Sequence, residues 1–161
     1  MGKRLLFFFE VLIMLTLFLL FGSLAATTLQ NDRIVDVTES FAEVVRYKGC
    51  ITRSMYDELL ASFPTAVNVN FEVTKKPALV TAEDIKDVEF SNEVIADVYG
   101  STGIYTMQTG DMFTVIVHKA SPTWFDTIVS AMTGEGTTQS PVIAVKGGMI
   151  LNEQYDVAGG D

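Results

Sequence analysis

The feature that most constrains this chain is a run of apolar residues near its N-terminus, residues 5–26. The run holds a single charged residue, Glu10. About 20 residues in a helix that rises about 1.5 Å per residue cross the roughly 30 Å hydrocarbon core of a bilayer. The sequence therefore predicts a membrane-spanning helix at residues 5–26.

The distribution of charge predicts the orientation of this helix. Lys3 and Arg4 precede the apolar run, whereas the rest of the chain is acidic and brings the net charge to −9. Basic flanks stay in the cytoplasm, so the part after Ala26 is expected outside the cell membrane. An acidic exported part repels phosphate groups, which argues against nucleic-acid binding and against a second, peripheral membrane contact.

A cleavable signal peptide is the alternative to a retained anchor. Ser23, Leu24 and Ala25 form a small-x-small pattern that signal peptidase accepts, with cleavage after Ala25. The apolar run is longer than the usual core of about 7 to 15 residues in a signal peptide, which favours retention. Both alternatives export the remaining chain.

Glu10 lies inside the apolar run, and an ionised carboxylate there costs a few kcal/mol unless it is paired. One interpretation is that its side chain reaches the cytoplasmic headgroups or is protonated. The other is that it pairs with a cation of a neighbouring subunit, for example a free amino terminus, and sets the register of an assembly. The sequence leaves both open.

Beyond the apolar run, residues 31–48 place apolar side chains at helical spacing, which predicts that the anchor continues as a long amphipathic helix. Gly49 is the expected end of this helix. Ser54 and Asp57 have the spacing of a capping box that starts a further short helix, which Pro64 ends.

The pattern then changes to the alternation typical of a half-buried strand at residues 67–74. One or two short helices are expected from Thr81, which forms a second capping box with Asp84, to Tyr99. Another helix is expected from Pro122, with Trp124 on its apolar side. The predicted hairpins are residues 104–107 with 112–119, turning at Gly110, and residues 142–145 with 149–152, turning at Gly147 and Gly148.

These elements predict an α+β fold, in which the outer half of one long N-terminal helix packs on a small antiparallel sheet. The other short helices would cover edges of the sheet or link its strands. The expected organisation is a membrane anchor at residues 1–26, an amphipathic helical stalk at 27–64 and an exported α+β domain at 65–161.

The residues of known catalytic and metal-binding patterns are absent from the sequence. His118 is the single histidine, and no nucleophile elbow, zinc-protease pattern or glycine-rich phosphate loop occurs. We therefore predict a protein that is not an enzyme, with no catalytic, cofactor-binding or metal site and no small-molecule substrate. The acidic run of Glu83, Asp84, Asp87 and Glu89 lacks the oxygen spacing of a calcium loop and is read as a solvated helix face.

Cys50 is the single cysteine, so the chain has no internal disulfide. It is interpreted either as a small, partly buried thiol or as half of an intermolecular disulfide.

The layout of the chain resembles that of pilin-like proteins: basic residues, an apolar helix with one glutamate, an amphipathic continuation and a small sheet domain. The stretches RYKGCITRSMYDELLASF, YTMQTGDMFTVIV and KGGMILNE are similar to TadE-like minor pilins of Tad-type (Flp) pilus systems. Prepilins of this kind are cut after a small residue with a glutamate at the fifth mature position, whereas Gly2 stands eight residues before Glu10.

The resemblance implies a non-catalytic structural or assembly subunit, with Glu10 as an assembly residue. Its expected partners are the membrane and other pilin-like or envelope assembly proteins. The alternative from the residues is a secreted envelope-binding domain released by cleavage after Ala25.

Overall fold

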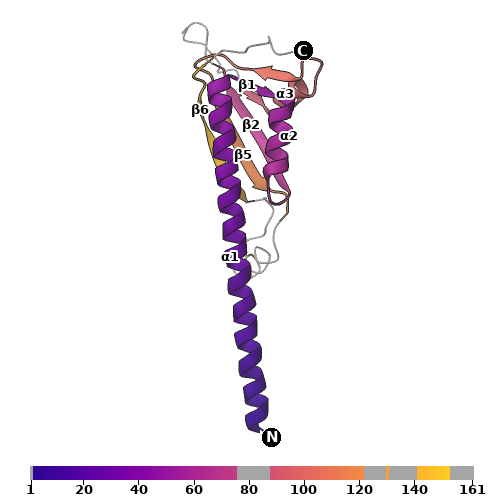
Figure 1. Cartoon of the computed structure of the whole chain (residues 1–161), viewed down its shortest axis with the longest axis vertical. Coiled ribbons are helices and arrows are strands. Elements are labelled where there is room, and N and C mark those ends of the chain that lie inside the picture. Colours follow the sequence, from indigo (N-terminus) through magenta and orange to yellow (C-terminus); the bar gives the residue numbers. More distant parts are fainter. Residues whose placement is uncertain (1, 76–87, 122–129, 131–140, 153–161) are drawn as a thin grey trace.

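The computed structural model describes residues 2–75, 88–121, 130 and 141–152, and its dominant feature is the helix α1, Gly2–Lys48 (Figure 1). The predicted continuation of the apolar helix into an amphipathic one is confirmed. The helix ends as expected at Gly49, which has a φ of 64° and donates its N–H to the carbonyl of Val45 over 2.8 Å.

The described elements after α1 form two antiparallel sheets, which confirms the α+β fold. One sheet has four strands in the order β3-β2-β5-β6, and the other pairs β1 with β4. In chain order the elements are β1 (Cys50–Thr52), α2 (Arg53–Ser62), β2 (Val67–Thr74), β3 (Val88–Phe90), α3 (Ser91–Val98), β4 (Ile104–Thr106), β5 (Met112–Lys119) and β6 (Val142–Met149).

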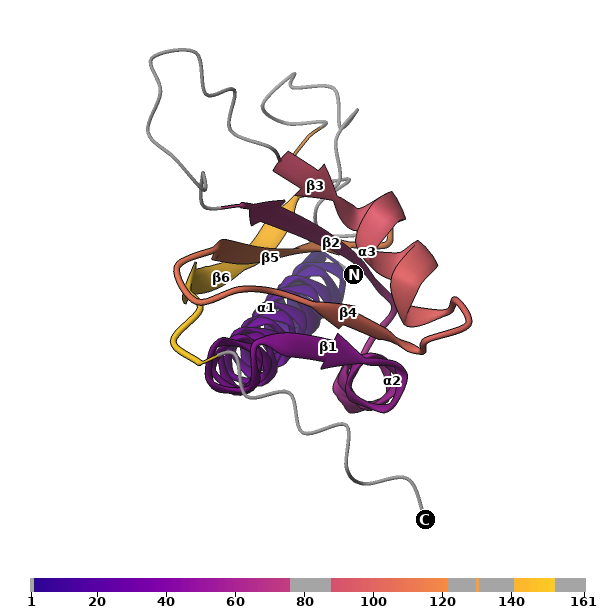
Figure 2. The ribbon, with the colours of Figure 1, turned by 90° about the horizontal axis from the view of Figure 1, so that it is seen from above.

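The core lies between the four-stranded sheet and the two helices α1 and α2, which cover the same face of it (Figure 2). Alternate residues of β2 point into this core, as the alternation at residues 67–74 predicted, and alternate residues of β5 do the same: Val73, Phe113 and Val115 are fully buried. The centre is aromatic, because the ring of Phe71 lies 5.9 Å from that of Phe113 and 5.7 Å from that of Tyr56.

The first predicted hairpin is wrong, because β4 pairs with β1 and not with β5. The turn itself exists: Gly110 has a φ of 100°, and the N–H of Asp111 donates to the carbonyl of Gln108. It connects two different sheets, however, and β5 pairs with β2 along its whole length. The strand β1 has only three residues, too few for its alternation to show in the sequence.

The last predicted hairpin is also wrong, since residues 142–149 form one continuous strand beside β5. Gly147 lies within this strand, and the adjacent strand β5 leaves no room for a side chain there. An added Cβ atom would come within 2.0 Å of the carbonyl oxygen of Phe113. Gly147 lets β6 lie close to β5, and Gly148 lets β6 lie close to Arg46 of α1. The two glycines therefore do not form a turn.

Two smaller expectations are corrected. Helix α2 is capped by Thr52, whose hydroxyl accepts the N–H of Met55 over 3.2 Å, so the predicted capping box at Ser54 does not start it. The segment before α3 contains strand β3, which was not predicted. The second capping box at Thr81, the helix from Pro122 and most of the acidic run lie outside the described residues.

Candidate functional site

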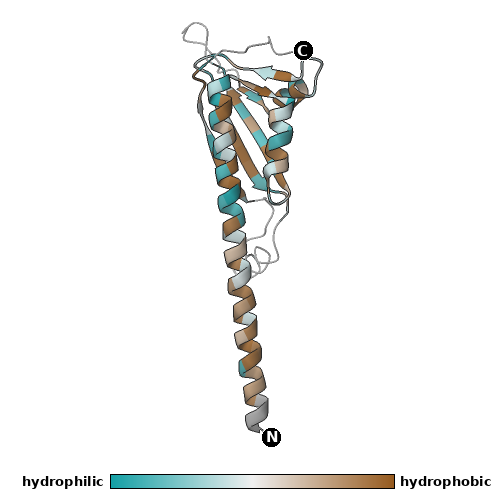
Figure 3. Cartoon of the chain, in the orientation of Figure 1, coloured by the Kyte–Doolittle hydropathy of each residue, from teal (hydrophilic) through white to brown (hydrophobic). Residues whose placement is uncertain are grey.

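The N-terminal half of α1 is almost entirely hydrophobic along its length (Figure 3), and its apolar side chains are exposed. Thirteen large apolar side chains between Leu6 and Phe21 are exposed, and the most apolar 18-residue window has a mean hydropathy of 2.3 with no buried residue. By length and composition this helix is able to cross a membrane. A signal sequence near an N-terminus has the same properties.

The threonine hydroxyl groups of this apolar segment and its end are bonded within the helix itself. Thr16 donates to the carbonyl of Leu12 over 2.8 Å, and Thr27 donates to that of Ser23 over 2.9 Å. A hydroxyl bonded four residues back needs no water, which suits an apolar surrounding. Sequence reasoning missed this feature. The signal is a threonine inside a predicted membrane helix, because its hydroxyl can bond to the carbonyl four residues earlier.

Glu10 is an exposed side chain of α1 among exposed apolar neighbours. Within the described residues no hydrogen bond or ion pair engages its carboxylate. Lys3 and Arg4 lie in the first turns of the same helix, and their side chains are outside the description. The structure thus leaves Glu10 available to a neighbouring molecule and does not test the predicted orientation.

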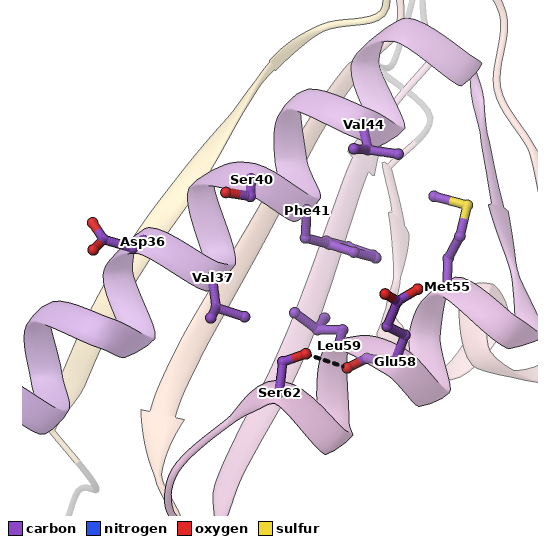
Figure 4. Close-up of a pocket in the computed structure, with 9 residues that line it drawn as sticks. All are labelled: Asp36, Val37, Ser40, Phe41, Val44, Met55, Glu58, Leu59 and Ser62. Carbon is purple, nitrogen blue, oxygen red and sulfur yellow. Dashed lines mark hydrogen bonds between the residues drawn. The ribbon is translucent and has the colours of Figure 1, made fainter.

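A groove runs between the outer half of α1 and helix α2 (Figure 4). It encloses about 330 Å³ and its floor is apolar, with Phe41 pointing from α1 toward Leu59 of α2. The hydroxyl of Ser62 at its rim donates to the backbone carbonyl of Glu58 over 2.8 Å. Among the described lining residues no hydrogen bond joins two polar side chains, so the groove suits apolar packing and holds no paired acid and base.

A partly buried polar cluster joins the two sheets. The hydroxyl of Tyr105 on β4 donates to Glu89 on β3 over 2.5 Å, and Lys75 forms an ion pair with the same carboxylate. Burial raises the pKa of Tyr105, and its bond to Glu89 raises it further. For Glu89, burial opposes ionisation, but the bonds from Lys75 and Tyr105 hold its pKa below the ordinary value. The cluster fixes β3 against β4.

The remaining candidates for chemistry are separate from one another. Cys50 is buried, and burial raises the pKa of its thiol. His118 lies near the end of β5, opposite Asn68 of β2. In the part of the chain that the structure describes, no three His, Cys, Asp or Glu side chains gather closely enough to hold a metal ion.

No protein-family model matches the chain, and neither a curated protein nor a solved structure is significantly similar to it.

Proposed function

We propose that this protein is a membrane-anchored, non-catalytic subunit of a pilin-like envelope assembly, similar to TadE-like minor pilins. In this proposal the N-terminus is cytoplasmic and the sheet domain lies outside the membrane. The observation that carries it is the division of α1 into two halves of different chemistry.

The outer half of α1 is part of the folded domain. Ile34, Thr38 and Val45 are buried against the sheet, and Lys146 of β6 forms an ion pair with Glu39 of α1 over 2.5 Å. The inner half is apolar and exposed, so it needs either lipid or other apolar helices around it. One continuous helix thus connects an apolar packing surface in the membrane to a folded domain outside it, with no flexible linker between them.

Glu10 gives this proposal its test. A lone carboxylate weakens a simple anchor, and a partner cation in an assembly would offset that cost. We expect Glu10→Leu to keep or raise the membrane level of the protein, while the fraction found in high-molecular-weight assemblies falls at least about tenfold, as loss of a buried ion pair implies.

Thr16→Leu is the matched control, because it also removes a polar group from the apolar half, one already bonded to Leu12. Quantitative blotting of membranes and sedimentation of cross-linked material provide the measurement. Equal incorporation of Glu10→Leu and the wild type would contradict the assembly role of Glu10, and a wild-type protein that never leaves the monomer fraction would contradict the subunit proposal.

A secreted binding domain is the second candidate, and one observation favours it. The first buried core residue is Ile34, so cleavage after Ala25 would leave the whole described core intact. N-terminal sequencing of the mature protein separates the two candidates: a start at Ala26 supports the secreted domain, and a retained apolar helix supports the subunit.

A further inference from the structure

Among the described residues, strand β2 is only partly covered on the edge that faces away from β5. Strand β3 pairs with β2 over Glu72, Val73 and Thr74 and then ends. The first part of β2, residues 67–71, extends beyond it. Residues 67–70, which no described strand covers on this side, are here called the β2 edge.

Alternate residues of an antiparallel strand direct their N–H and C=O groups to opposite sides. At Phe71 these groups face away from β5, where Ser91 takes the place of a strand: its hydroxyl accepts the N–H of Phe71 over 2.6 Å and donates to its C=O over 3.3 Å. Val69 and Val67, two and four residues earlier, direct their groups the same way. Within the described residues nothing bonds to these groups on that side.

A hollow of about 780 Å³ lies along the β2 edge. Its described lining consists of residues 67–70, Tyr56 and Leu60 of α2, and His118 and Val142 at the adjacent ends of β5 and β6. Leu60 is exposed, whereas the side chain of Val69 is buried in the core. The hollow therefore combines backbone groups without a partner among the described residues with apolar side chains of α2 and the polar side chains of Asn68 and Asn70.

Strand β6 forms the opposite edge of the sheet and, unlike the β2 edge, is protected against strand addition. On β6, Lys146 points inward to Glu39, and Arg46 donates to the carbonyl of Met149 over 3.2 Å. Inward charges and covering helices are devices by which proteins block edge strands. The β2 edge carries neither a charge nor a proline between Val67 and Asn70.

We propose that the β2 edge is a binding site for an extended segment of another protein, which adds as a strand in line with β3. Its backbone would bond to Val67 and Val69, and its inward side chain would be apolar and lie against Tyr56 and Leu60. Main-chain bonds provide affinity in this kind of recognition, and alternate side chains provide specificity.

Charge indicates which segment fits. The chain carries a net charge of −9, so a second copy would bring like charge to the contact. The described lining of the hollow holds no acidic or basic residue except the histidine His118. The occupant is therefore an uncharged or basic segment of a different polypeptide, and the proposal holds whether or not the apolar helix is retained.

Amide hydrogen exchange of the full chain in detergent micelles tests the proposal. A blocked hexapeptide of alternating threonine and valine, at roughly millimolar concentration, is the probe. Without the peptide, the amides of Val67 and Val69 are expected to exchange at least about tenfold faster than those of Asn68 and Asn70, which face β5. With the peptide they should slow at least about tenfold.

Val69→Pro removes one edge-directed N–H without breaking the ladder to β5, and it should abolish the peptide effect. Val145→Pro is the matched control, since it removes an outward N–H from β6, and the effect should persist. If Val69→Pro does not fold, Leu60→Lys places a charge over the edge and should weaken the effect at least about tenfold.

Three results would overturn the proposal. The first is peptide protection on β6 instead of β2, and the second is equal protection by a peptide whose backbone is N-methylated. The third is protection of Val67 and Val69 without peptide that grows with protein concentration, which would make a second copy the occupant.

Discussion

The side chain of Arg46 lies directly over Gly148, where an added Cβ atom would come within 2.8 Å of its Nε. The same Nε donates to the carbonyl of Met149, and the carbonyl of Arg46 accepts the N–H of Leu151 over 2.9 Å. The last turns of α1 thereby hold the end of β6, and a side chain at position 148 would separate them.

The neighbouring glycine gives the first prediction. Gly147→Ala places its Cβ 2.0 Å from a backbone oxygen of β5, which cannot move without shifting the strand, so we expect a loss of about 2 kcal/mol or more in the free energy of unfolding. Gly22→Ala is the control, because nothing lies within 4 Å of its added Cβ. Chemical denaturation followed by circular dichroism measures both, and equal midpoints would contradict the close approach.

The aromatic centre gives the second prediction. Phe41 of α1 packs against Phe71 and Phe113, with ring centres 6.2 and 6.4 Å apart. Phe41→Ala should lower the free energy of unfolding by about 3 to 5 kcal/mol, as for other buried aromatic residues. Tyr47→Ala, on an exposed position of the same helix, should change it by less than about 0.5 kcal/mol. A loss for Phe41→Ala as small as that expected for Tyr47→Ala would contradict the packing of α1 on the core.

Acid sensitivity gives the third prediction, from Glu89. The pKa of Glu89 in the folded protein is lower than the ordinary value of 4.5. Its contribution to the free energy of unfolding is therefore complete above about pH 4.5 and is lost as the pH falls through the pKa of the folded state. We expect the wild type to lose more stability than Glu89→Gln between roughly pH 6 and pH 3.

Urea denaturation at several pH values measures this difference. Tyr105→Phe removes one of the two groups that stabilise the carboxylate, so its acid sensitivity should fall between those of the wild type and Glu89→Gln. Parallel loss of stability in all three proteins would mean that the cluster does not hold Glu89 ionised.

Thiol labelling gives the fourth prediction, which concerns orientation. A membrane-impermeant maleimide should label Tyr47→Cys in intact cells, because position 47 is exposed and lies beyond the predicted anchor. The wild type is the control: Cys50 is 4% exposed and burial raises its pKa, so it should react only after denaturation. Labelling of Tyr47→Cys only after lysis would reverse the predicted topology.

The parts of the fold that the sequence predicted are those decided by local periodicity. The amphipathic part of the long helix and the alternation of β2 follow from burial of one face, and the same period of two places Phe113, Val115 and Val117 of β5 on the core face. The division of the chain at residues 26 and 64 stays a prediction.

The errors concern pairing, which local patterns do not determine. Gly110 does mark a turn, but which strands meet across it depends on β1, a strand of three residues. Gly147 and Gly148 have the composition of a turn, yet they are glycines because Phe113 and Arg46 lie against them. The β2 edge was not foreseen either, since it exists only because β3 stops where Ser91 begins α3.

The continuity of α1 has a mechanical consequence. Its 47 residues make a rod of about 70 Å, and no proline interrupts it. Helical hydrogen bonds continue without interruption from the apolar end to the last turns, which pack on β6. A rotation or tilt of the apolar end is therefore transmitted to the sheet almost completely. The direction in which the β2 edge faces is then set by the contacts that hold the apolar end of α1.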